Sequence, residues 1–218
     1  VDGSGVLWAG TDGYGIIRTF PDGRREYLST GNSSLPSNSI SSMVQDSRGT
    51  IWLSSSDKGL ISFRDGRFSL FSGQDAVGTK RCGQLYYDKP RDYLYLGTSG
   101  NGFSIIDASD GEVLRTVCDD FSKWNTAFTV SEDGTLWVGT VNGICKYDFV
   151  SQSLVHVKLN CVHGNSRIYT LTTTTDGKVM AGCTQGLVEF DPTLGHAVLY
   201  TTEDGLSENA VMGIVEDD

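Results

Sequence analysis

The segment around Trp124 contains residue types that bind sugars. Trp124 lies in the run Asp119-Asp120-Phe121-Ser122-Lys123-Trp124-Asn125, between polar residues. The face of an indole ring can cover the C–H side of a pyranose, while polar neighbours bind the hydroxyls. We therefore expect Trp124, together with Lys123 and Asp120, to contribute to a ligand site. The alternative is that Trp124 fills the end of a hydrophobic core.

Cations elsewhere in the chain could bind an anionic sugar. Lys80, Arg81 and Arg167 could clamp a carboxylate, as on a uronic acid, through charge-assisted hydrogen bonds. The alternative is solvated charge that balances an acidic protein. Further candidates are expected in loops on the same face of the fold: Tyr14, Asn101, Asn142 and His163.

Sequence patterns for catalysis and metal binding are absent. The three His residues are not spaced with Cys or carboxylates as metal ligands are, and there is no Gly-x-Ser-x-Gly elbow or phosphate-binding glycine loop. The adjacent Asp119 and Asp120 would diverge on an extended chain, so they form no acid–base pair. We expect no catalytic residue, no metal and no cofactor in this chain.

Composition narrows the class of protein. The chain has 218 residues, with 17 Lys+Arg against 27 Asp+Glu and a net charge of −10, which argues against a nucleic-acid partner. The 5 Cys are odd in number and form no Cys-x-x-Cys motif, so we expect free, mostly buried thiols. Both ends of the sequence resemble internal positions of a longer protein, and we expect the chain to be an excised piece of one.

A repeat explains which elements position these residues. Five similar segments are centred on aromatic or apolar anchors, and the spacings between successive anchors are 44, 43, 42 and 43 residues. The anchors are Trp8, Trp52, Tyr95, Trp137 and Met180. A sixth repeat begins where Leu206–Val211 matches Leu35–Ile40, and Asp217 falls at the position of Asp46.

One period contains four short strands. In the second repeat, apolar or alternating segments cover residues 40–45, 50–55, 60–64 and 67–72, and turns with Gly separate them. Four antiparallel strands in about 43 residues indicate a propeller blade. We expect an all-β chain in which residues 1–218 form one β-propeller domain, or part of one, from five four-stranded antiparallel blades. The anchors would lie between blades, and the glycine-closed turns would supply positive φ angles.

Blade topology sorts the loops between two faces. The turns between second and third strands share a face with the long connections between blades, and function concentrates on such longer loops. We therefore expect a ligand on this connection face. The connections are residues 31–38, 73–84, 118–125, 160–167 and 202–209.

The repeat pattern resembles the two-component regulator propeller. The resemblance rests on Leu35, Asn38 and Ile40, followed by Asp46, Gly49, Ile51, Trp52, Gly59 and Leu60, and on similar segments in other repeats. It implies the periplasmic sensor region of a hybrid two-component histidine kinase of the Bacteroides type, anchored in the inner membrane, with kinase activity in a separate domain. It also implies oligosaccharide ligands, a homodimer, and contacts with further blades and a second propeller of the same receptor.

The sequence departs from that family pattern in two respects. Five repeats are two fewer than the seven of the family, so we expect a fragment of a larger, seven-bladed propeller. The alternative is that the five repeats close into a five-bladed ring. The third repeat has the irregular lead-in Gly83–Pro90. There are two alternative functions: a structural or dimerisation scaffold with the ligand bound elsewhere, and a propeller lyase or glycosidase.

Overall fold

The protein is built almost entirely from β-strands. A computed structural model describes residues 1–162 and 166–216; His163 and Asp217 lie outside these ranges. The described chain has strands β1 to β19, one short helix α1 (Gln74–Val77) and one 3-10 turn η1 (Thr202–Asp204). The all-β expectation is therefore confirmed. No helix in the described ranges has the length and apolar character needed to cross a membrane.

Consecutive strands form five antiparallel sheets. Four sheets have four strands, and the sheet β1-β2-β3 has three, because the first repeat opens at its second strand. The expectation of blade-like four-stranded repeats is confirmed. The chain divides into two compact units, Val1–Thr116 and Val117–Asp218, and each is described by itself.

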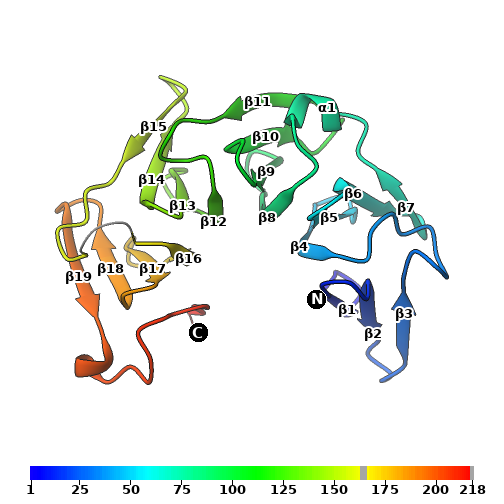
Figure 1. The fold of residues 1–218 in the computed structure, drawn as a ribbon, viewed down its shortest axis with the longest axis horizontal. Coiled ribbons are helices and arrows are strands. Elements are labelled where there is room, and N and C mark those ends of the chain that lie inside the picture. The colour runs from blue at the N-terminus through cyan, green and yellow to red at the C-terminus, as the bar shows by residue number, and fades with distance from the viewer. Residues whose placement is uncertain (163–165, 217–218) are drawn as a thin grey trace. The chain divides into compact units, whose positions relative to one another are not determined.

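The first unit contains three sheets, which Figure 1 shows in blue, cyan and blue-green. Buried side chains between the first two sheets include Ile16, Leu53 and Ile61, and those between the second and third include Leu60, Leu94 and Leu96. The strands are β1 (Leu7–Gly10), β2 (Ile16–Thr19), β3 (Arg25–Leu28), β4 (Ile40–Gln45), β5 (Ile51–Ser55), β6 (Gly59–Arg64), β7 (Arg67–Leu70), β8 (Cys82–Asp88), β9 (Tyr93–Thr98), β10 (Phe103–Asp107) and β11 (Val113–Val117).

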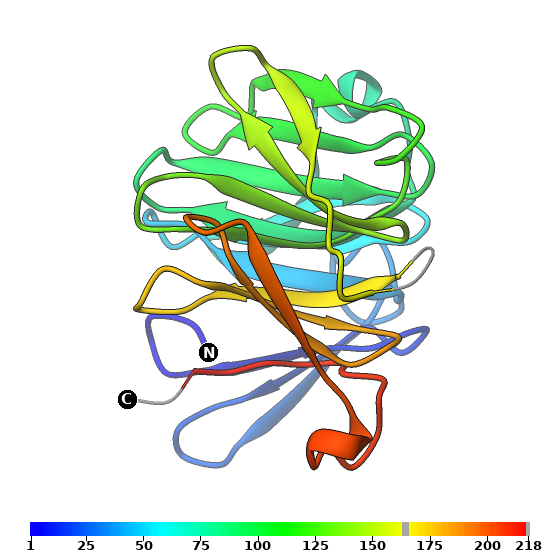
Figure 2. The ribbon, with the colours of Figure 1, turned by 90° about the vertical axis from the view of Figure 1, so that its left-hand side faces the viewer.

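The second unit contains two sheets and the C-terminal segment. Trp137 and Ile144 of one sheet pack with Ile168, Val188 and neighbours of the other in one hydrophobic core. Figure 2 shows the twist of the last sheet and the chain turning back after η1. The strands are β12 (Asn125–Val130), β13 (Leu136–Thr140), β14 (Gly143–Asp148), β15 (Ser153–His156), β16 (Ile168–Thr173), β17 (Val179–Cys183), β18 (Leu187–Asp191) and β19 (His196–Tyr200).

A carboxylate in the turns before β1 and β5 explains the Asp–Trp spacing of the first two repeats. Asp46 accepts the indole N–H of Trp52 at 3.0 Å and the backbone N–H groups of Thr50 and Arg48 at 2.9 Å. Asp2 accepts from Trp8 in the same way at 2.8 Å. The buried indole thus has a partner for its only polar group, as buried polar groups require. The six-residue spacing, 52 − 46 and 8 − 2, follows from this bond.

Small residues on the second strands let neighbouring sheets approach closely. A Cβ added at Gly10 would lie 2.8 Å from Ile40 Cγ2, and one at Gly139 would lie 2.8 Å from Ile168 Cγ2. Glycine is therefore required there by backbone approach, as expected for this strand. At the equivalent point of the second sheet, Ser54 instead donates a hydrogen bond to the carbonyl of Gly83. The irregular third repeat thus places a glycine opposite the larger residue.

Candidate ligand-binding face

Turns and connections meet on one face of each sheet, as the topology predicts. Asn101 Nδ2, in the turn after β9, donates to the carbonyl of Val77 in the preceding connection at 2.8 Å. Asn142 Nδ2, after β13, donates to the carbonyl of Phe121 at 2.9 Å. Both predicted ligand contacts therefore have an amide group bonded to the backbone of a connection. Their structural role is to hold the connection against the turn.

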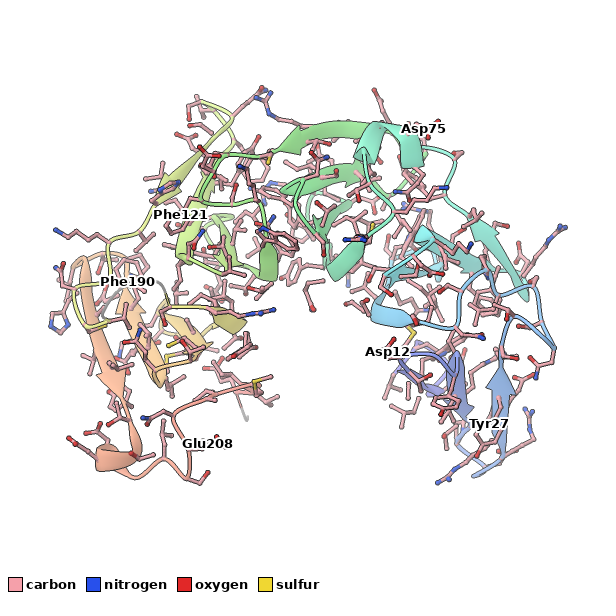
Figure 3. All side chains as sticks on the ribbon, viewed as in Figure 1. Asp12, Tyr27, Asp75, Phe121, Phe190 and Glu208 are labelled. Carbon is pink, nitrogen blue, oxygen red and sulfur yellow. The ribbon has the colours of Figure 1, made fainter. Side chains whose placement is uncertain are left out.

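The connection 118–124 is fastened to its own sheet by a second set of contacts. Asp119 Oδ1 accepts the Ser122 N–H at 2.7 Å, and Asp119 Oδ2 lies 3.0 Å from His156 Nε2 on β15. The Phe121 ring stacks on His156 with 4.2 Å between ring centroids. Figure 3 labels Phe121 in this connection. These contacts fix the loop that leads into Trp124.

The charge of Asp119 is stabilised by these partners. Partial burial alone raises the pKa of the Asp119 carboxyl, but hydrogen bonds from Ser122 and His156 outweigh burial and hold the pKa below its usual value. Asp119 therefore acts as an ionised anchor for the loop. Asp120 has a different partner, since its Oδ1 lies 2.6 Å from Lys123 Nζ. The hydrogen bond with Asp120 raises the pKa of Lys123.

Trp124 does not fill the end of the core. Its side chain is 48% exposed, whereas Trp52 and Trp137 are 8% and 3% exposed. The backbone of Trp124 is held, because its carbonyl accepts the Val141 N–H at 3.2 Å. An exposed ring on a fixed backbone is what a stacking platform for a flat ligand needs.

Trp124 shares its place in the repeat with two of the predicted cations. We call the residue immediately before a first strand the pre-strand position; it is occupied by Arg81 before β8, Trp124 before β12 and Arg167 before β16. Each carbonyl accepts a backbone N–H from the turn after the second strand: Ser99 to Arg81 at 2.9 Å, Val141 to Trp124 at 3.2 Å and Thr184 to Arg167 at 3.2 Å. All three side chains are exposed.

Comparison of Trp124 with the Trp anchors alone did not show this equivalence in the sequence. The signal was present in the spacing. The intervals 124 − 81 and 167 − 124 are both 43, the same period as the anchors. A search for exposed aromatic and cationic residues at one repeat phase would have found the set.

The remaining candidates lie apart from this set. Tyr14, in the turn after β1, is 86% exposed and contributes only backbone to the turn, where its N–H donates to Thr11 Oγ1 at 3.1 Å. Lys80 lies between α1 and β8 and is exposed. The structure therefore groups Trp124 and Arg167 within the second unit, and it leaves Tyr14 and Lys80 as exposed residues of the first.

A cavity of about 320 Å³ opens beside the 118–124 connection. Its lining includes Phe121, Asn142, His156, Lys158, Leu159 and the buried Ser166. A larger hollow of about 600 Å³ lies on the opposite face, over the buried Trp137 and Phe190 between the two sheets of this unit. The described residues contain no group of three His, Cys, Asp or Glu side chains placed to hold a metal ion.

The five cysteines are present as thiols, of which Cys82, Cys145 and Cys183 are buried. Burial raises the pKa of Cys82 to about 11 and that of Cys145 to about 12. Cys145 pairs with His156 across β14 and β15, and Asp119 lies beyond that histidine. A thiol with a pKa so high is protonated at neutral pH, so this trio is not an activated nucleophile.

Comparisons with known proteins support the repeat and the fold. Residues 34–57 match the family described as "Two component regulator propeller". No curated protein matches the sequence. Among solved structures, the extracellular domain of a protein named as a hybrid two component system, BT3049 of B. thetaiotaomicron, is similar with a TM-score of 0.77 and 22% identity over 96% of this chain. A second, BT4673 of the same organism, has a TM-score of 0.62 and 26% identity over 79% of this chain.

The likeness extends to propellers of other activity. Virginiamycin B lyase from Staphylococcus aureus has a TM-score of 0.73 at 13% identity, over 92% of this chain and 67% of that one. The chain spans only 28% and 22% of the two B. thetaiotaomicron proteins. A likeness shared by regulators and lyases shows the fold and not an activity. The chain is thus a β-propeller segment that contains a two component regulator propeller repeat at residues 34–57.

Proposed function

We propose that this chain is part of the ligand-sensing module of a hybrid two-component histidine kinase, located outside the cytoplasm, and that it responds to oligosaccharides from polysaccharide breakdown. The observation that supports this most is the match of residues 34–57 to the regulator propeller family, together with the likeness to two extracellular domains of such systems. The parent would lie in the periplasm, anchored in the inner membrane. Its kinase would occupy a separate domain.

Signalling in the parent would work by a shift between two conformations. A ligand that binds one arrangement of propellers and dimer partner more tightly than the other moves the receptor toward that arrangement. We place the ligand on the connection face, because the exposed Trp124 has a fixed backbone there. Further blades, a second propeller and a homodimer partner complete the proposed receptor.

Binding is tested by thermal unfolding of this chain against a panel of defined plant and host oligosaccharides. A ligand at 100 times its dissociation constant adds about 2.7 kcal/mol to the free energy of unfolding. For a chain of this size that raises Tm by roughly 5–10 °C. We expect such a shift for one glycan family in the unaltered protein and its loss in Trp124→Ala.

A matched aromatic control separates stacking from general damage. Tyr27→Ala removes an exposed ring from β3 of the first sheet, and we expect it to keep the shift. If no glycan shifts Tm, the proposal fails for this chain, and the scaffold role becomes the better explanation. Release of reducing sugar or unsaturated uronate during long incubation with mixed polysaccharides would instead indicate a lyase or glycosidase.

A further inference from the structure

We infer that the ligand of the second unit is an anionic oligosaccharide, which stacks on Trp124 and places a carboxylate or sulfate against Arg167. This inference rests on the proposed function and specifies the ligand of the same face. It depends on three observations: the equivalent positions of the two residues, the ion-pair state of Arg167, and the contacts that hold each side chain.

Trp124 and Arg167 leave the backbone at the same point of adjacent sheets. Asn125 pairs with Thr140 and Ile168 pairs with Cys183, and in both sheets a bulge follows within two residues. Residues 124 and 167 therefore have the same register relative to their own sheets. The two sheets pack face to face through the core around Trp137 and Ile168. Side chains at equivalent positions on such sheets start about 10 Å apart.

That spacing suits a ligand longer than one sugar. A single pyranose that stacks on Trp124 would barely span the distance to the guanidinium of Arg167. An oligosaccharide can lie on the indole with one unit and present the charged group of the next to the guanidinium. The fixed carbonyls of both residues keep the two anchor points in place, which lowers the entropic cost of binding.

Arg167 has a free charge in an acidic protein. The net charge of the protein is −10, yet no described carboxylate lies within ion-pair distance of Arg167. The guanidinium carbon of Arg167 lies 5.6 Å from the centroid of the Tyr169 ring. By contrast, Lys123 is paired with Asp120 and Lys178 with Glu189. A guanidinium that stacks on an aromatic ring keeps its N–H fork free for a bidentate anion.

The two carboxylates that precede Trp124 in the connection both have partners. Asp119 is bonded to His156 and Ser122, and Asp120 is bonded to Lys123. Of the two carboxylates nearest to Trp124 in sequence, Asp120 is thus ion-paired and Asp119 is hydrogen-bonded. An anionic sugar on the indole would meet an ion-paired carboxylate and an unpaired guanidinium, which is the electrostatic arrangement that favours it over a neutral sugar.

The test compares charged and neutral ligands of equal length by calorimetric titration of the full chain. The three arms are oligogalacturonides, the same oligomers with every carboxyl methyl-esterified, and sulfated oligosaccharides. We expect tight binding of at least one anionic arm, and at least 10-fold weaker binding of the esterified one. Loss of one charge-assisted contact corresponds to a change of that size.

Two variants assign the effect to Arg167. We expect Arg167→Gln to weaken binding of the anionic ligand by at least about 10-fold, and to leave binding of the neutral ligand unchanged. Arg67→Gln, which removes an exposed arginine charge from β7, is the matched control and should bind as the unaltered chain does. An equal loss in both variants would mean non-specific attraction and would overturn the inference.

The outcomes also separate the inference from the proposed function. Binding of neutral oligomers that depends on Trp124 but not on Arg167 would overturn the anionic ligand and keep the oligosaccharide sensor. Absence of binding in every arm would overturn both. Preference between the carboxylated and sulfated arms identifies which anion Arg167 accepts.

Discussion

At the scale of single residues, the Asp carboxylate of each Asp–Trp turn accepts several hydrogen bonds, and its removal should lower the free energy of unfolding. The side chain of Asp46 is fully buried and accepts hydrogen bonds from Trp52, Thr50 and Arg48. Asp46→Ala would leave these buried donors without an acceptor, and we expect a loss of about 2–3 kcal/mol in the free energy of unfolding. Denaturant unfolding followed by Trp fluorescence measures this change.

The control for that prediction is another aspartate in a turn. Asp22 accepts the N–H of Arg24 at 2.9 Å but is exposed, so Asp22→Ala should cost less than about 1 kcal/mol. If Asp22→Ala and Asp46→Ala lowered the free energy of unfolding equally, burial of the Asp46 hydrogen bonds would not contribute to stability.

Residue types alone do not show which group a turn side chain binds. Asn101 and Asn142 were predicted as ligand contacts because they lie in turns on the connection face, and in the structure their Nδ2 groups donate to backbone carbonyls. Sequence cannot tell which turn side chain a connection will use to satisfy its carbonyls. Trp124 was recognised as a candidate, whereas its equivalence with Arg81 and Arg167 required knowing where each first strand begins.

At the scale of elements, close approach between sheets depends on glycine in the second strands. A Cβ at Gly139 would meet Ile168 Cγ2 at 2.8 Å and Ala127 Cβ at 3.2 Å. Because both neighbours belong to the packed core, they cannot move without strain, and we expect Gly139→Ala to cost about 1–3 kcal/mol. Gly213→Ala is the matched control, since a Cβ there would meet nothing within 4 Å.

Thermal unfolding of the two alanine variants side by side checks this expectation. Gly213→Ala should leave Tm close to that of the unaltered chain, while Gly139→Ala should lower it. A Gly139→Ala variant as stable as the control would show that the sheets have room to separate, and close approach would then not explain the glycine.

Elements with strong periodic signals were predicted well, and a short irregular one was not. The alternation of apolar residues located the strands of the second repeat within about two residues of β4 to β7. Helix α1 lies inside residues 73–84, which were expected to be a connecting loop. It has only four residues between Gly73 and Gly78, which is too short for a 3.6-residue period to appear in the sequence. The next strand, β8, begins at Cys82, inside the expected connection.

At the scale of the whole molecule, the sheets should differ in stability because they differ in number of strands. Strand β5 has a partner on each side, β4 and β6, whereas β1 pairs with β2 alone among the described strands. Leu7 of β1 is 50% exposed, and Ile51, at the same place in β5, is 5% exposed. Local opening is easiest where few apolar contacts and few paired neighbours hold the backbone.

We therefore expect the amides of residues 7–10 to exchange with deuterium much faster than those of residues 51–55. Hydrogen–deuterium exchange with mass spectrometry of the 218-residue chain measures both segments in one experiment. Slow exchange in β1 would mean that a further strand pairs with it. The segment 211–216 is the candidate for that strand, since Leu206–Val211 repeats the sequence before and into β4. Equal protection of β1 and β5, lost when residues 211–216 are deleted, would establish a closed five-bladed ring. Fast exchange in β1 alone would show that this chain does not close as a five-bladed ring.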